Sequence, residues 1–176
     1  MEVNTTLIDC CDPKDHSKVL FHFLILDAPS PSNLPTYVKE LQRRNVRHLV
    51  RVCGPTYDTS LVQNNGIEVH SWPFDDGAPP TRSVIESWLK LLDQELLKMK
   101  EDPAATAPTI GVHCVAGLGR APILVALALV EYGQVPALDT IALIREKRKG
   151  AINQIQMNWL TKYKRRRQSG GDCVTM

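Results

Sequence analysis

The sequence lacks any apolar run long enough to cross a membrane, and cysteine and aromatic residues are sparse. Its longest apolar stretch, residues 121–130, falls well short of the roughly 18 residues that a spanning helix needs. Five cysteines in 176 residues are too few for a disulfide scaffold, and the odd number leaves at least one unpaired. The first 18 residues contain four acidic residues and no apolar core of a secretory signal. We therefore expect an intracellular protein with reduced thiols.

Repeats, linkers and biased segments are also missing, which excludes collagen, coiled coils, disordered chains and multidomain proteins. The length and the 43% content of apolar residues fit one globular domain. The net charge of +2 conceals an asymmetry along the chain. Residues 1–144 contain 12 basic and 17 acidic residues, whereas residues 145–176 contain 9 basic and 2 acidic residues. The basic end is therefore a candidate contact for an anionic partner.

Hydrophobic periodicity predicts strands followed by helices. Apolar or alternating runs predict strands at 18–27, 46–53, 67–72 and 109–114, and a turn cluster at 30–35 could begin a helix reaching 44. Helical spacing predicts helices at 80–100, 121–132, 136–149 and 154–167. This order indicates an α/β sheet with helices on both faces. We predict one domain over residues 17–167, between flexible segments at 1–16 and 168–176.

The segment with the clearest chemistry is residues 112–122, with the sequence VHCVAGLGRAP. Glycines at 117 and 119 let the backbone turn its N–H groups inward, and the next helix adds positive charge at its N-terminus. Arg120 can hold two phosphate oxygens with its planar guanidinium. Cys114 lies among these donors, so we expect a thiolate nucleophile there. His113 is expected to support the loop through hydrogen bonds rather than to act as a base.

Other glycine-rich loops do not fit this spacing. A dinucleotide fingerprint would need a third glycine where Pro122 stands, and a nucleotide P-loop would need Gly-Lys-Ser/Thr after four intervening residues. The simplest alternative is a structural cysteine with an unrelated arginine nearby. Against it, the segment combines a predicted strand, the His-Cys pair, two glycines, the arginine and the start of a predicted helix.

His-Cys followed by five residues and Arg is the signature of the cysteine-dependent phosphatases. Three longer segments, WPFDDGAPP at 72–80, residues 112–122 and VALAL at 125–129, resemble the phosphatases of regenerating liver (PRL), also called protein tyrosine phosphatase type IVA. Matches around residues 51–58 and 145–151 extend the similarity to about residues 18–165. The resemblance implies a dual-specificity-type phosphatase fold, a mostly parallel twisted sheet between helices, and catalysis without a metal or organic cofactor. It also implies a phosphate-binding loop made of Val115, Ala116, Gly117, Leu118, Gly119 and Arg120.

The departing oxygen of a phosphate ester needs a proton, and Asp75 and Asp76 form an adjacent pair of carboxylates 39 and 38 residues before Cys114. Two acids at a turn can also simply cap a helix or solvate a loop. The PRL resemblance implies that Asp76 is the general acid and Asp75 its neighbour. It also implies slow turnover through an accumulating phosphocysteine, because Ala121 stands where most cysteine phosphatases have a hydroxyl residue.

Cys53 closes a predicted strand, and such a cysteine is usually a core residue. The PRL resemblance implies a reversible disulfide between Cys53 and Cys114, which would protect the nucleophile from irreversible oxidation. Cys10 and Cys11 lie outside the match and receive no role.

The basic cluster of residues 162–167 precedes a polar spacer and Cys173, followed by Val-Thr-Met. This end fits a prenylation box imperfectly, and its terminal methionine favours farnesyl. A basic cluster is otherwise usually a solvated helix end or a nucleic-acid patch, but no nucleic acid is expected here. One lipid at Cys173 and the basic residues together would supply two signals for an anionic membrane. We expect the cytoplasmic face of the plasma or endosomal membrane, with a soluble cytoplasmic pool.

Two functions remain open at this point. The first is an enzyme that hydrolyses phosphoproteins, or phosphoinositides, in the tyrosine phosphatase class. The second is a regulator whose pocket binds a cyclin M magnesium-transport mediator, as the PRL resemblance implies, and the same resemblance implies a possible homotrimer. Rhodanese-like sulfur transfer also uses a loop cysteine but would not explain residues 72–76.

Overall fold

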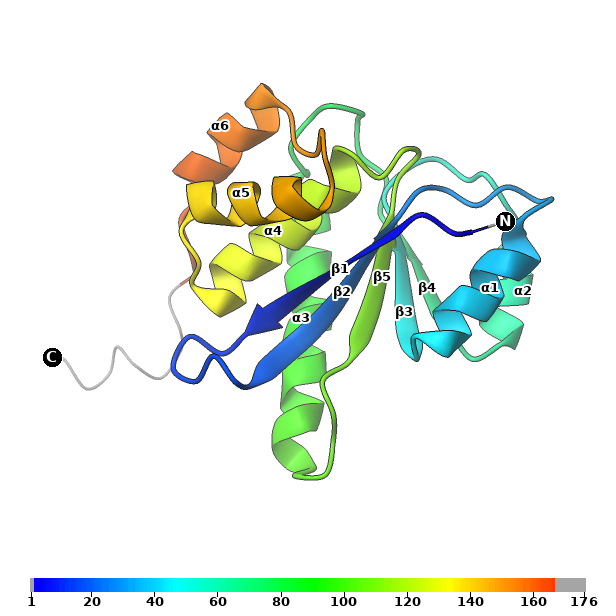
Figure 1. Cartoon of the computed structure of the whole chain (residues 1–176), viewed down its shortest axis with the longest axis horizontal. Helices are drawn as coiled ribbons and strands as arrows, with labels where there is room; N and C mark the ends of the chain where they lie inside the picture. The colour runs from blue at the N-terminus through cyan, green and yellow to red at the C-terminus, as the bar shows by residue number, and fades with distance from the viewer. Residues whose placement is uncertain (1, 167–176) are drawn as a thin grey trace, which may run out of the picture.

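A computed structural model describes residues 2–166 of the chain (Figure 1). The five strands are β1 (Thr5–Cys11), β2 (Val19–Leu26), β3 (Val46–Arg51), β4 (Glu68–Ser71) and β5 (Thr109–His113). The helices are α1 (Leu34–Arg43), α2 (Ser60–Asn64), α3 (Arg82–Glu101), α4 (Arg120–Gly133), α5 (Ala137–Lys147) and α6 (Gln154–Lys162). The predicted α/β class, with a mostly parallel sheet between helices, is confirmed.

The strands form one sheet in the order β1-β2-β5-β3-β4. Strands β2, β5, β3 and β4 are parallel neighbours, and only β1 is antiparallel, paired with β2. In the register of β3 with β5, Arg51 is paired with His113. The carboxyl ends of the four parallel strands therefore lie at the same end of the sheet, which is where parallel α/β sheets place their ligand sites.

Helices cover both faces of the sheet, and each face has its own apolar core. On one face α3, α4, α5 and α6 share one apolar core, which includes Trp88, a fully buried side chain whose Nε1–H donates to the Leu124 carbonyl over 2.9 Å. On the other face α1 and α2 cover Leu24, Leu26 and Leu49. Helix α4 is buried almost all round, which fixes the position of its first turn against the sheet.

The N-terminal segment corrects the sequence analysis, which expects residues 1–16 to be a flexible extension. Residues 5–11 instead form the edge strand β1. Its side chains alternate, so that Ile8 and Cys10 are buried while Leu7 and Asp9 face outward. Across the pair with β2, Asp9 lies 2.6 Å from His22. Hydrogen bonds to β2 and the apolar contact of Ile8 order a segment whose own sequence signal is weak.

Two more boundaries differ from the prediction. The short helix α2 was not expected at all, and α6 ends at Lys162 rather than at 167. Beyond α6 the backbone is extended at Tyr163, and Arg166 donates through Nε to Glu131 over 2.7 Å and through Nη1 to Asp93 over 2.9 Å. These ion pairs to α4 and α3 hold the chain outside helical geometry.

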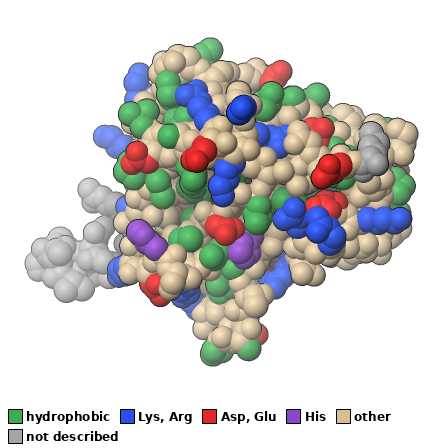
Figure 2. Space-filling model, in the orientation of Figure 1, with side chains coloured by type: hydrophobic (Ala, Val, Ile, Leu, Met, Phe, Trp, Pro, Cys, Tyr) green, Lys and Arg blue, Asp and Glu red, His purple; other side chains and the backbone are tan. Residues whose placement is uncertain are grey.

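The surface shows no segregation of charge on the face drawn in Figure 2, where acidic, basic and apolar side chains are interspersed. Among the described residues, no helix combines the length and the apolarity that crossing a bilayer requires.

Candidate active site

The loop after β5 runs from Cys114 to Gly119, and α4 begins at Arg120. Gly117 has φ +68°, and a Cβ there would lie 2.7 Å from the Leu26 carbonyl oxygen, so only glycine fits. The Leu118 carbonyl accepts from the Ile152 N–H over 2.7 Å, and the Val115 carbonyl accepts from the Ala28 N–H over 2.8 Å. The loop is therefore held at both sides in a tight turn around the buried thiol of Cys114.

A buried arginine, Arg148, braces the loop from behind. Its Nε donates to the Gly117 carbonyl over 2.6 Å and its Nη2 to the Ala116 carbonyl over 3.3 Å. Its Nη1 donates to Thr6 Oγ1 over 3.0 Å, which ties the loop to β1. Burial lowers the pKa of Arg148 from its ordinary value, and the neighbouring Asp27 opposes that shift.

Arg120 is buried, and its Nη1 reaches the Phe74 carbonyl at 3.4 Å. Its Nε has no hydrogen-bond partner within residues 2–166. The Asp76 Oδ1 lies 3.7 Å from this Nε, while the Asp76 side chain is 86% exposed. An exposed carboxylate thus faces a buried guanidinium that still has a free donor, at the rim of the Cys114 loop.

The loop that carries Asp76 is held by the start of α6. Asn153 donates through Nδ2 to the Gly77 carbonyl over 2.9 Å, and Gln156 donates through Nε2 to the Ala78 carbonyl over 3.1 Å. The same two side chains form a capping box at the helix start. The two side chains that cap α6 therefore also hold the loop that carries Asp75 and Asp76, here called the acidic loop, against the phosphate-binding loop.

His113 is fully buried and bonded at both ring nitrogens. Its Nδ1 lies 3.1 Å from the Cys114 carbonyl oxygen and its Nε2 lies 2.7 Å from the Tyr57 hydroxyl. Burial lowers the pKa of His113 to about 4, although the bond to the Cys114 carbonyl opposes the shift. A neutral imidazole then donates to the carbonyl and accepts from Tyr57, which is the supporting geometry that the sequence analysis expects.

Cys53 follows β3 as Cys114 follows β5, and these strands are hydrogen-bonded neighbours. The Val52 N–H donates to the His113 carbonyl over 3.0 Å, and Cys53 Sγ lies 3.9 Å from His113 Nδ1. Both thiols are free and buried. Burial raises the pKa of Cys53, the Arg120 charge lowers it, and Cys114 raises it.

Comparisons with known proteins agree with this geometry. The protein-tyrosine phosphatase family model matches residues 36–162. The chain is 79% identical to "Protein tyrosine phosphatase PRL-1" of Leishmania major over the whole of both chains. It is 44% identical to mouse "Protein tyrosine phosphatase type IVA 2", covering 92% of this chain and 95% of that one. A solved Leishmania major protein tyrosine phosphatase superposes with a TM-score of 0.87 at 80% identity, covering 92% of this chain and 99% of the other.

The chain belongs to the PRL (type IVA) protein tyrosine phosphatases. The expected family is confirmed, and with it an enzyme of the protein-tyrosine phosphatase class. In this PRL phosphatase the structure brings together the loop residues, Arg120, Asp76, His113 and Cys53. Asp75 lies beside Asp76 on the exposed part of the loop, and Ala121 is buried in the first turn of α4. Cys173 lies outside the described residues.

The sequence analysis missed the residues that position the loops of the PRL site. Arg148, Tyr57, Asn153 and Gln156 reach the site from 31 to 78 positions away along the chain. The Arg148 side chain lies in a predicted helix next to three other basic residues, so its charge pattern reads as surface. Only the Asn-x-x-Gln spacing at 153–156, typical of a helix start, offered a local signal, and it indicates a cap rather than a site.

Proposed function

We propose that the chain hydrolyses phosphate monoesters of proteins through a phosphocysteine intermediate. Cys114 attacks the phosphorus, Arg120 holds the phosphate oxygens, and Asp76 protonates the departing oxygen. The observation that carries this proposal is the free, buried Nε of Arg120 beside the Cys114 loop, with Asp76 Oδ1 3.7 Å away. A bound phosphate would supply the missing acceptor and would sit between nucleophile and acid. The chemistry uses no metal.

The second half of the reaction is proposed to be slow. Water must expel the Cys114 thiolate from the phosphocysteine, and a hydroxyl beside Arg120 would stabilise that leaving group. Residue 121 is an alanine that is fully buried, so neither its side chain nor a water molecule at its position supplies the hydroxyl. Hydrolysis of the intermediate is then the rate-limiting step.

The test of catalysis is hydrolysis of a small aryl phosphate by the full chain. Activity is expected to disappear in Cys114→Ser and to remain in Cys10→Ser, which changes a buried cysteine distant from the loop in the fold. Equal activity in the wild type and Cys114→Ser would refute the proposed nucleophile.

Partner binding over the same pocket is the second candidate. Val115 and Leu118 are apolar residues of the loop, yet they are 56% and 40% exposed. Two exposed apolar side chains around a buried anion site favour a protein surface as the partner, such as a cyclin M magnesium-transport mediator. A phosphoryl group on Cys114 would add charge at the centre of that contact. Such binding should weaken in Leu118→Ala, which removes an exposed apolar side chain, and should persist in Asp76→Ala, which removes only the proposed acid.

Oxidation of the site is proposed to form a disulfide between Cys114 and Cys53. A peroxide would convert the Cys114 thiolate to a sulfenic acid, releasing water or hydroxide, and the Cys53 thiol would then displace a second water. The raised pKa of Cys53 supports this order, in which Cys114 is oxidised first and Cys53 reacts second. Cys53 stays a thiol until the sulfenic acid forms on Cys114. Peroxide inactivation should be reversed by a dithiol in the wild type, and only partly reversed in Cys53→Ser.

Membrane attachment is proposed to depend on the basic end and on farnesylation of Cys173, and the membrane-bound protein is proposed to assemble as a homotrimer. Arg166 contributes less than the sequence suggests, because its hydrogen bonds to Asp93 and Glu131 raise its pKa and engage its charge within the domain. Among the described residues of the basic end, Lys162, Lys164 and Arg165 are exposed and lie outside these ion pairs, although Arg165 Nε also donates to the Glu131 carbonyl over 3.3 Å. Mass spectrometry of the protein from its native cell should show loss of the last three residues and a farnesyl group.

A further inference from the structure

Three potential metal ligands meet on β4, which is the edge strand opposite β1, and on its neighbour β3. In the register of β3 with β4, His48 is paired with Glu68, and His70 follows two residues later on the same face. His48 Nδ1 lies 3.0 Å from His70 Nε2 and 3.1 Å from Glu68 Oε2. The three ligand atoms all lie within 4.8 Å of one another.

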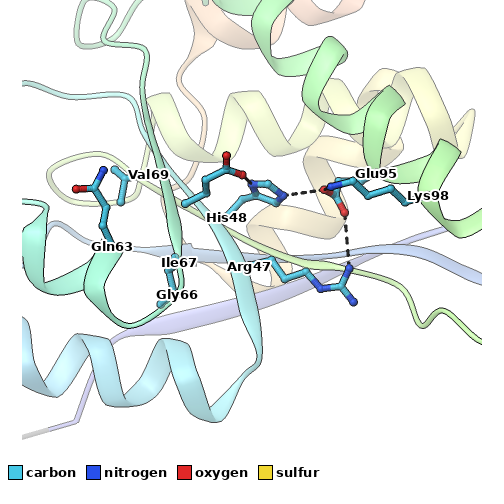
Figure 3. Close-up of a pocket in the computed structure, with 9 residues that line it drawn as sticks. Arg47, His48, Gln63, Gly66, Ile67, Val69, Glu95 and Lys98 are labelled. Atoms are coloured by element: carbon cyan, nitrogen blue, oxygen red, sulfur yellow. Dashed lines mark hydrogen bonds and ion pairs between the residues drawn. The ribbon is translucent and has the colours of Figure 1, made fainter.

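Helix α3 supplies a fourth residue that orients His48. Glu95, buried in α3, places Oε1 2.8 Å from His48 Nε2, and the same oxygen accepts from Lys98 over 3.0 Å (Figure 3). Arg47 lies 3.8 Å from the other carboxylate oxygen. When one ring N–H of a neutral histidine donates to a carboxylate, the other ring nitrogen offers a lone pair that can bind a metal. In this tautomer the lone pair of His48 Nδ1 faces His70 and Glu68.

Protons and a cation are alternatives at this cluster. With a proton on each ring nitrogen, His48 donates from Nε2 to Glu95 and from Nδ1 to Glu68 Oε2 over 3.1 Å, and His70 Nε2, 3.0 Å from Nδ1, competes for the second of these protons. Without a proton on Nδ1, His48 Nδ1 and Glu68 Oε2 are two acceptors 3.1 Å apart. A cation between the three atoms contacts all of them at once.

We propose that His48 Nδ1, His70 Nε2 and the Glu68 carboxylate bind a divalent transition-metal ion of the zinc class. Zinc bonds of 2.0–2.1 Å in tetrahedral geometry separate neighbouring ligand atoms by about 3.3 Å. The two separations of 3.0 and 3.1 Å therefore need to widen by only a few tenths of an ångström. Two imidazoles with one carboxylate favour zinc, nickel or copper over magnesium and calcium, which prefer oxygen ligands alone.

Two of the three proposed ligands, His48 and Glu68, line an open cavity of about 710 Å³ beside these strands, from which a fourth ligand can approach. Arg47, Gln63 and Lys98 line it together with His48 and Glu68, so a water molecule or a small anion can complete the tetrahedron. None of the lining residues belongs to the Cys114 loop or to the acidic loop. The metal is therefore a clamp that joins the edge strand β4 to β3 and, through Glu95, to α3, and it takes no part in phosphate chemistry.

The experiment uses the full, untagged chain carrying Cys114→Ser, so that the loop thiolate cannot bind metal. Zinc is titrated by competition with a chromophoric chelator, and cobalt(II) serves as a spectroscopic probe of the same site. We expect one tight equivalent and four-coordinate cobalt absorption without a thiolate charge-transfer band. Loss of a ligand in Glu68→Gln or His70→Gln should weaken zinc binding at least tenfold, and Glu95→Gln should weaken it roughly 10- to 100-fold.

Glu68→Gln is the decisive variant because its side chain is 69% exposed and its replacement leaves the core intact. His16→Gln, at an exposed histidine of the turn between β1 and β2, is the matched control and should bind like the parent. Zinc should also raise the thermal midpoint of the parent and of His16→Gln, but not that of Glu68→Gln. The proposal would be overturned if the parent bound no zinc tightly, or if Glu68→Gln and His70→Gln bound zinc as tightly as the parent. Cobalt absorption dominated by a thiolate band would also overturn it.

Discussion

Arg120 combines burial, a free Nε and an exposed carboxylate 3.7 Å away, which is the geometry of a site that awaits an anion. The Asp76 side chain is 86% exposed, whereas the Arg120 side chain is buried in the first turn of α4. The acid is thus the solvent-exposed partner and the arginine is the buried one. At the scale of single residues, the proposed chemistry depends on this difference.

Asp76→Asn should lower kcat/KM by roughly 10²- to 10⁴-fold for a phenyl phosphate, because kcat/KM reports formation of the phosphocysteine and the phenolate then leaves without a proton. The loss should be much smaller for a substrate whose leaving group is already a stable anion, such as a nitrophenyl phosphate. Asp75→Asn is the matched control on the same loop and should keep most of the activity. Steady-state kinetics with the two substrates check this, and an equal loss in both variants would contradict the role of Asp76.

Ala121→Ser should speed hydrolysis of the phosphocysteine, because the new hydroxyl can stabilise the departing thiolate. In rapid-quench experiments the wild type should release a burst of phenol followed by slow turnover. The serine variant should show a smaller burst and a faster steady state. An unchanged steady-state rate together with an unchanged burst would show that a different step limits turnover.

At the scale of elements, β1 has two functions. It covers β2, and its Thr6 hydroxyl accepts the hydrogen bond from Arg148 that braces the catalytic loop. The strand also places Ile8 in the core between the sheet and the helices. A segment that looks like an extension in the sequence is therefore part of both the fold and the site.

Ile8→Ala should lower the free energy of unfolding by about 2–5 kcal/mol, since it removes a fully buried side chain and leaves a cavity. Leu7→Ala, on the outward face of the same strand, is the matched control and should cost much less. Urea denaturation of the two variants measures the difference. Equal effects would mean that β1 does not pack in solution as described.

The elements also show what sequence reasoning can reach. The strands at 46–53 and 109–114 were predictable because their apolar runs end in glycine, proline or the cysteine loop. Strand β1 was not predictable, because Asp9 and the adjacent residues Cys10 and Cys11 weaken its alternating pattern. Its stability comes from hydrogen bonds to β2. The Cys114 loop is local, so its residues could be named. Arg148, Tyr57 and Gln156 enter the site only through packing of distant segments, and His48, Glu68 and His70 meet only through strand register.

At the scale of the whole molecule, His113 couples stability to pH. Burial holds its pKa at about 4 in the folded state against an ordinary value of 6.5, so the unfolded chain binds more protons between these pH values. The folded state therefore loses stability as the pH falls from 6.5 to 4, by about 3 kcal/mol from this group.

Replacing His113 by asparagine should flatten this pH dependence, whatever its effect on stability at neutral pH. Urea denaturation of the wild type and His113→Asn between pH 7 and pH 4 measures the two slopes. His16→Gln, at an exposed histidine, should keep the slope of the wild type. Parallel curves for wild type and His113→Asn would mean that other groups cause the acid sensitivity.

In the proposed reaction, turnover passes through a phosphoryl group on Cys114. Intact-protein mass spectrometry after acid-free quenching of a reaction with phenyl phosphate tests it most directly. We predict a species heavier by one phosphoryl group during turnover, located on Cys114 by peptide mapping, diminished in Ala121→Ser and absent in Cys114→Ser. Turnover without any such species, or a phosphoryl group on another residue of the wild type, would contradict the account.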